Sequence, residues 1–407
     1  MKPTRAFIKI ASADLIVRSA YQMGKTPLLP IFAATLGASG PFLGLIASVS
    51  TCTGLLLKPL IGMLSDRWGR RGWLVMGTLV FTLMPFSYRF VQRPEHLLIL
   101  RVLHGMATVI YGPVTLAYVA EHAQRQRAET LGWFGVARNI GYIVGPALAG
   151  GLLAQHVDPV QIFTLIGWIS ALAMIPVLRL PESAPLRTQP LFSFSQHVRH
   201  ALRAGSCAPS IWLAGSLEAI VLIALYAAKI FLPLYAISLS ISIALGGLFL
   251  ALQETVYMLG KPFGGRLGDR FGYCSIICLG MVALGSALTL LTWAQHAWSL
   301  LALAIVIGAA QALIFPATVA LVAAQIEGQH LGAGLGLLGT LKNAGKVIGP
   351  MLGGLLSQWL DFPAMFQSMG GLLIIGAGAV WFGARHVSTG PAQSSLFNLF
   401  YPSRRTS

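Results

Sequence analysis

The chain has 407 residues, of which 56% are hydrophobic and only 10% are charged, and its mean hydropathy is +0.74. Soluble proteins carry about 25% charged residues, so this composition excludes an ordinary soluble protein and indicates a membrane protein. The formal net charge of +16 could suit nucleic acid. The cations gather in loops on one side of the expected topology, however, which predicts a lipid bilayer and no nucleic acid as partner.

Twelve apolar segments approach or exceed the ~20 residues that cross a bilayer. They leave no room for a separate soluble domain. The longest polar stretch, 181–208, is expected to be a cytoplasmic linker between a six-helix bundle (1–180) and a second bundle with a cytoplasmic tail (209–407). The expected spans are 8–36, 41–63, 73–92, 96–121, 130–155, 159–180, 210–237, 242–264, 273–294, 297–325, 329–358 and 362–385.

The distribution of Lys and Arg predicts which side of the membrane each loop faces. Seventeen of them lie in loops that the topology places inside, and two, Arg89 and Arg93, lie on the opposite side. The positive-inside rule therefore puts both termini in the cytoplasm, in agreement with an even number of spans. The first apolar stretch contains Asp14, Arg18 and Lys25 and no small-residue cleavage site, which favours a span over a cleaved signal peptide.

Two sequence signatures occur twice, half a chain apart. Residues 58–69, at the end of the second span, recur as 261–272 with the same Lys-Pro and Asp-Arg steps, 203 residues later. The spaced glycines and the Gly-Pro step of 132–150 recur in 336–354, 204 residues later. Such a duplication in an apolar chain indicates a transporter with its site between the halves.

The repeated Gly-Pro steps, Gly145-Pro146 and Gly349-Pro350, lie in the fifth and eleventh spans. Glycines about one helical turn apart let two transmembrane backbones approach closely, and the proline removes a helix donor and permits a bend. Such helices suit a hinge. A plain packing motif explains the glycines equally well, so only the prolines favour gating.

The spans contain an excess of positive charge, with nine cations against three acids. Each costs about 2.5–3.5 kcal/mol at a helix centre, so such residues normally face a cavity or a partner. The candidate substrate-binding cations are Arg18, Lys25, Arg101, Arg138, Lys229 and Lys342. The candidate proton carriers are Asp14, Glu218 and Glu254.

These charges predict an anionic or zwitterionic substrate. Asp14, Arg18 and Lys25 fall on one stripe of the first span, and Glu218 and Lys229 repeat its eleven-residue spacing in the seventh. The alternative is that these cations form ion pairs with the acids of the spans and do not bind substrate, but three acids can neutralise three cations at most. The acids suit proton transfer because burial disfavours the charged form of a carboxyl group and a nearby cation favours it.

Three motifs in the first half carry a resemblance to a known family. Residues 62–71, 97–105 and 132–150 resemble motifs A, B and C of the major facilitator superfamily, with His104 where motif B usually has glutamine and Ala149 in place of one motif C glycine. Motif C is typical of the drug:proton antiporter branch. The resemblance implies an all-α membrane protein of two pseudo-symmetric six-helix bundles, with twelve transmembrane helices and both termini cytoplasmic. It also points the charges of the first, fourth and seventh spans toward a central cavity.

The resemblance further implies a cytoplasmic latch. Asp66 would face a helix N-terminus of the other half, and Arg70 would pair with Glu121. The alternative is topogenic, since arginines after the second span hold the loop inside. The repeated Asp-Arg step favours a latch, although Tyr273 stands where Arg70 would recur. The candidate gating residues are Asp66, Arg67, Arg70, Glu121, Asp269, Arg270, Gly145, Pro146, Gly349 and Pro350.

We therefore expect a monomeric, non-enzymatic secondary transporter of the inner or plasma membrane. No Walker motif occurs, and no cofactor or metal is expected. The predicted function is proton-coupled export of an organic anion or zwitterion (a metabolite, metallophore or amphiphilic drug) by alternating access. The alternatives are proton-coupled uptake of an anionic metabolite, against which motif C argues, and a non-transporting assembly factor or sensor with a transporter-like fold.

Overall fold

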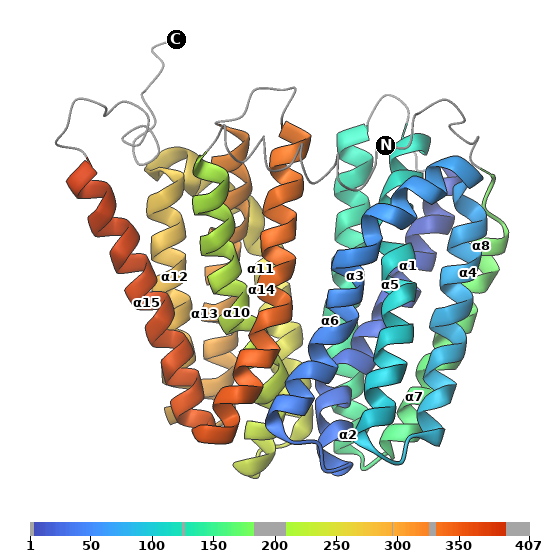
Figure 1. The fold of residues 1–407 in the computed structure, drawn as a ribbon, viewed down its shortest axis with the longest axis horizontal. Coiled ribbons are helices and arrows are strands. Elements are labelled where there is room, and N and C mark those ends of the chain that lie inside the picture. Colours follow the sequence, from blue (N-terminus) through green and yellow to red (C-terminus); the bar gives the residue numbers. More distant parts are fainter. Residues whose placement is uncertain (1–3, 124–126, 183–208, 295, 325–330, 388–407) are drawn as a thin grey trace. The chain divides into compact units, whose positions relative to one another are not determined.

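The structure is a computed structural model, and it describes residues 4–123, 127–182, 209–294, 296–324 and 331–387. Within these ranges all regular secondary structure is helical (Figure 1). The predicted linker, 181–208, lies outside the described residues except at 181 and 182. The division into bundles at 1–180 and 209–407 stays a prediction.

Each predicted span in the first half falls on one helix or on a run of consecutive helices. The first is interrupted at η1, where Thr26 leaves helical geometry. The elements are α1 (Arg5–Met23), η1 (Gly24–Leu28), α2 (Leu29–Thr35), α3 (Gly40–Trp68), α4 (Arg70–Leu83), η2 (Met84–Phe90), α5 (Pro94–His122), α6 (Arg127–Ala154), α7 (Pro159–Leu172) and α8 (Met174–Leu178).

The second half repeats this pattern. Of the described segments in the whole chain, nine are long and apolar enough to cross a membrane, and the other three predicted spans coincide with α1–α2, α4–η2 and α14. The elements are α10 (Pro209–Ser238), α11 (Ile243–Phe271), α12 (Tyr273–Leu290), η3 (Leu291–Trp293), α13 (Ala297–Ala323), α14 (Leu331–Trp359) and α15 (Phe362–Val387).

The chain forms two compact units, residues 1–194 with 229–251 and residues 195–228 with 252–407. In the first unit α1 packs on α6, and α3 on α5. Its core is an apolar cluster that α1, α4 and α5 share, including Ile10, Phe81 and Tyr118. In the second unit α12 packs against α13 and α15.

Glycines let α6 approach α1 closely. A Cβ atom at Gly145 would lie 2.8 Å from the Ser19 carbonyl oxygen and 2.9 Å from the Met23 nitrogen, so only glycine fits without a backbone shift. Gly349 on α14 repeats this contact, because a Cβ there would lie 3.0 Å from the Ile223 Cα of α10. Close packing is therefore seen at Gly145 and Gly349, whereas a Cβ at Gly132 or Gly336 would have no atom within 4 Å. The prolines of the Gly-Pro steps lie inside continuous helices, and the hinge stays a prediction.

Candidate functional site

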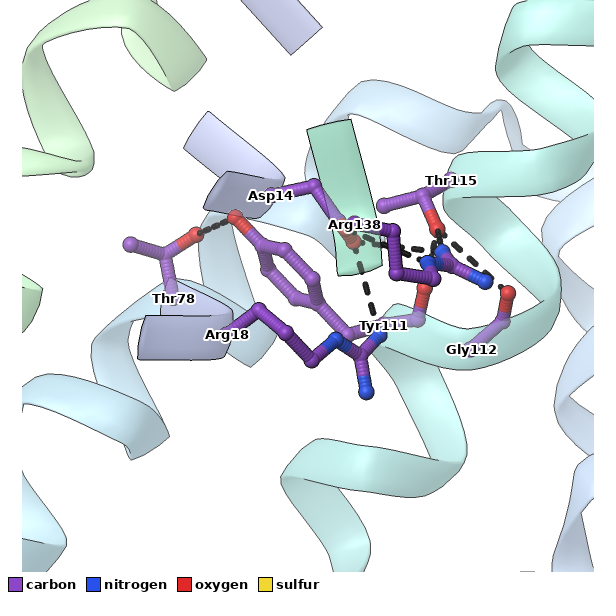
Figure 2. Close-up of polar contacts among 7 residues, drawn as sticks. All are labelled: Asp14, Arg18, Thr78, Tyr111, Gly112, Thr115 and Arg138. Atoms are coloured by element: carbon purple, nitrogen blue, oxygen red, sulfur yellow. Dashed lines mark hydrogen bonds and ion pairs between the residues drawn. The ribbon is translucent and has the colours of Figure 1, made fainter. Parts of the chain in front are cut away.

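Asp14 is the centre of a buried charged cluster in the first unit (Figure 2). Its side chain is 1% exposed. Arg138 of α6 donates from Nε to Oδ2 and from Nη2 to Oδ1, both at 3.2 Å. The Nη2 atom of Arg18 lies 3.5 Å from Oδ1, one turn along α1. Two guanidinium groups therefore share one carboxylate.

Helix α5 completes this cluster through Thr115. Arg138 Nη2 donates to Thr115 Oγ1 at 2.8 Å, and the Thr115 hydroxyl in turn donates to the backbone carbonyl of Tyr111 at 2.5 Å. The Tyr111 hydroxyl lies 3.1 Å from Thr78 Oγ1 of α4, as Figure 2 shows. Side chains from three helices, α1, α5 and α6, thus hold Arg138 and Asp14 together.

A second cluster surrounds Glu218 on α10, in the second unit. Its side chain is 0% exposed, and Lys342 Nζ of α14 lies 2.5 Å from Oε1. Thr318 of α13 donates from Oγ1 to Oε2 at 3.0 Å. The Lys342 ammonium also lies 4.7 Å from the ring centroid of Phe315, a cation–π distance. Its side chain is 32% exposed.

The two clusters are copies of one arrangement. Asp14 and Arg138 correspond to Glu218 and Lys342 at an offset of 204 residues, and Thr115 corresponds to Thr318 at 203. We call Asp14, Arg138 and Thr115 the N triad, and Glu218, Lys342 and Thr318 the C triad. Arg138 and Lys342 were candidates from the sequence, and the threonines were not, although the repeat offset relates them as well.

The triads change the interpretation of three predicted substrate-binding cations. Arg18, Arg138 and Lys342 are ion-paired with Asp14 or Glu218, so for these three the internal-pairing alternative holds. A role for them in substrate binding stays a prediction.

Motif B forms a separate buried cluster in the first unit. Arg101 is 2% exposed and donates from Nη2 to Ser50 Oγ at 2.6 Å, while its guanidinium lies 5.8 Å from the Tyr21 ring centroid. His104, 6% exposed, meets Tyr21 and Phe81 edge-on at 5.3 and 5.4 Å. Neither ring nitrogen of His104 has a hydrogen-bond partner among the described residues.

The remaining candidates lie on other elements. Lys25 lies on η1, with its Nζ 6.0 Å from the ring centroid of Tyr21, on the side of the motif B cluster. Lys229 lies on α10, eleven residues after Glu218, and Glu254 lies on α11. Their predicted roles are untested by these contacts.

The latch contains the ion pair that the family resemblance implied. Arg70 Nη2 lies 2.8 Å from Glu121 Oε1 and 2.8 Å from Asp66 Oδ1, and the Arg70 side chain is only 7% exposed. The pairing of Arg70 with Glu121 is confirmed. The approach of Asp66 to a helix of the other half, and the gating role of this latch (Asp66, Arg70 and Glu121), stay predictions.

The second half has a weaker copy of this contact. Tyr273, which stands where Arg70 would recur, donates its hydroxyl to Asp269 Oδ1 at 2.7 Å. Arg67 and Arg270 are exposed at the ends of α3 and α11. The arginine-based latch is therefore a property of the first half.

The sequence profile of the Major Facilitator Superfamily matches residues 18–253 and 218–397. The chain belongs to this superfamily. It is 25% identical over 368 residues to the multidrug resistance protein MdtG of Salmonella heidelberg (strain SL476), covering 87% of this chain and 89% of the relative. It is equally identical, over the same length, to the multi-drug resistance efflux pump PmrA homolog of Lactococcus lactis subsp. lactis, covering 87% and 88%.

Solved structures agree on the fold. The crystal structure of the nucleoside transporter NupG superposes with a TM-score of 0.79 at 14% sequence identity, over 93% of this chain and 99% of NupG. The family and the fold show that the chain is a non-enzymatic, multi-pass transporter of small molecules in the inner or plasma membrane. The predictions of superfamily, fold and membrane location are thereby confirmed.

Proposed function

We propose that this transporter is proton-coupled and exports an organic anion or zwitterion. One observation carries the proposal: each half buries a carboxyl group against a cation of a neighbouring, glycine-packed helix, Asp14 with Arg138 and Glu218 with Lys342. A carboxyl group held in this way can exchange its cation for a proton. Because the exchange removes a tie between two packed helices, it supplies a route from protonation to helix movement.

The sign of the substrate follows from the charge within the spans. Nine cations against three acids leave an excess of positive charge even when every acid is paired. A site in such surroundings attracts a carboxylate, phosphate or sulfonate group and repels a simple cation. The excess supports a substrate with at least one anionic group.

Export is supported by motif C and by the relatives that are named for multidrug resistance and efflux. Antiport requires that proton and substrate compete. The ammonium group of a zwitterion would compete with the proton for a triad carboxylate while its anionic group binds a cation. Among the two substrate classes, a zwitterion therefore fits export better.

The second candidate is proton-coupled uptake of an anionic metabolite, and the same ion pairs favour it. A substrate anion that takes Lys342 away from Glu218 would leave the carboxylate without its cation, and the carboxylate would then bind a proton more readily. Anion and proton would bind together, which is symport. An ammonium group on the substrate would thus favour antiport over symport.

Purified protein in proteoliposomes that enclose a pH-sensitive dye tests both candidates. We expect proton movement on addition of zwitterionic or anionic metabolites and none with simple cations. Its direction relative to the substrate separates antiport from symport. Glu218→Gln should lose this coupling. Asp361→Asn, which neutralises an exposed carboxylate at the start of α15, should keep it. Coupled transport of simple cations alone would refute the proposal.

A further inference from the structure

The N triad and the C triad are unequal in one respect. Asp14 faces a second guanidinium, that of Arg18, one turn along its own helix. The position that corresponds to Arg18 in the second half, 204 residues later, is Leu222, which is 2% exposed. Asp14 therefore lies beside two guanidinium groups, whereas Glu218 lies beside the ammonium group of Lys342 and has an apolar residue at the position of Arg18.

The hydrogen bonds also hold Asp14 more firmly than Glu218. Both oxygens of Asp14 accept hydrogen bonds from Arg138. In Glu218, Oε2 accepts from the Thr318 hydroxyl, while Oε1 is paired with the single ammonium group of Lys342, 2.5 Å away. Asp14 is thus held by two donors of one guanidinium group, and Glu218 by one ammonium and one hydroxyl group.

These differences set the cost of adding a proton. Protonating Asp14 would disrupt a bidentate pair and leave two guanidinium groups, which remain charged, around a neutral acid. Protonating Glu218 would displace a single ammonium group on a flexible stem, and the Lys342 side chain is already 32% exposed. The C triad gives up its ion pair at the lower cost.

We propose that Glu218 binds the coupling proton, and that Asp14 stays ionised and positions Arg18 and Arg138. The proton comes from water and forms the O–H bond on Oε1, while Lys342 keeps its own charge and moves off that oxygen. This assignment rests on the proposed function, because it names the residue that would perform the proton coupling.

The charged and polar groups near Glu218 include side chains of α13 and α14. Helix α14 contributes Lys342 and, one turn further, Lys346, whose Nζ lies 5.6 Å from the ring centroid of Tyr226 on α10. Helix α13 contributes the hydroxyl group of Thr318. The ammonium of Lys342 is thus the charge in direct contact with the carboxylate, and its movement is the event that follows protonation.

Infrared pH-difference spectroscopy on the purified full-length protein tests the assignment without any substrate, because a protonated carboxyl group has a C=O stretching band of its own. Acidification of the wild type should produce a band from a buried carboxyl group. We expect Glu218→Gln to abolish this band and Asp14→Asn to retain it. Loss of the band in Asp14→Asn, or its persistence in Glu218→Gln, would overturn the assignment.

Two further variants cover the case in which Asp14→Asn fails to fold. Arg18→Leu, which gives the N triad the residue type found in the second half, should leave the Glu218 band in place. Thr318→Val, which removes the hydrogen bond to Oε2, should shift the frequency of the band. A band that is unmoved by Thr318→Val does not come from Glu218 and would also refute the assignment.

The infrared experiment and the proteoliposome experiment can fail independently of each other. A Glu218 band without substrate-driven proton movement in proteoliposomes would refute the coupling and leave the proton site assigned. Proton movement together with a band that survives Glu218→Gln would refute only the assignment.

Discussion

Neutralising the two triad carboxylates should destabilise the protein unequally. Asp14→Asn leaves the guanidinium groups of Arg138 and Arg18, 18% and 15% exposed, without their counter-charge. Removing one partner of a buried ion pair costs about 3–5 kcal/mol. Glu218→Gln releases only Lys342, whose side chain is 32% exposed and can turn toward water, so the loss is closer to that of one charge-assisted hydrogen bond, about 1.5–3 kcal/mol.

Thermal unfolding of purified protein in one detergent and at one heating rate measures this difference. The common heating rate is required because irreversible unfolding makes the apparent midpoint rate-dependent. We expect the midpoint to fall more for Asp14→Asn than for Glu218→Gln, and Asp361→Asn to provide the baseline for loss of a carboxylate that caps a helix. An equal or larger fall for Glu218→Gln would refute the argument that the extra guanidinium makes the N triad the more costly one to break.

Three further outcomes are expected. Gly145→Ala should destabilise the protein by about 1–3 kcal/mol through overpacking, whereas Gly151→Ala on the same helix, where a Cβ would have no atom within 4 Å, should be nearly neutral in the same thermal assay. Asp66→Asn should reduce transport strongly at nearly unchanged yield of folded protein, and wild-type rates would contradict the latch. Lys25→Gln or Lys229→Gln should weaken binding of an anionic substrate by about 1–3 kcal/mol in equilibrium binding, and tighter binding of a cationic dye would contradict the predicted sign.

Much of the fold could be predicted because the signals were local. Apolar segments of sufficient length predicted the positions of the long helices, nine of which could cross a membrane, and the repeated Asp-Arg and Gly-Pro steps predicted two related halves. The break in the first span was not predicted, although Pro27 and Pro30 lie near it. Proline removes a helix donor, yet Pro113 and Pro233 lie inside continuous helices, so the presence of a proline alone does not locate a break.

The candidate site was harder to predict because its partners are distant in sequence. The i,i+4 spacing of Asp14 and Arg18 made their pairing the alternative interpretation, but Asp14 and Arg138 lie on separate spans, and only packing of α6 on α1 brings them together. The charge count of the spans predicted a surplus of cations but did not show which cations form ion pairs with the acids. Thr115 and Thr318 carried no charge signal, and only the internal repeat could have singled them out.

The two halves differ in the side chains that tie their helices together. At four corresponding positions the first half has a guanidinium group and the second half has an ammonium, a hydroxyl or an apolar side chain. The pairs are Arg18 with Leu222, Arg70 with Tyr273, Arg101 with Ala304, and Arg138 with Lys342. Guanidinium groups stay charged at any pH a cell meets and bind carboxylates through two parallel bonds, so they hold helices in one arrangement. A single ammonium or a hydroxyl group holds them less firmly. The duplicated backbone thus combines a first half tied by permanent charges with a second half whose ties can open, and proton-dependent rearrangement is expected to begin in the second.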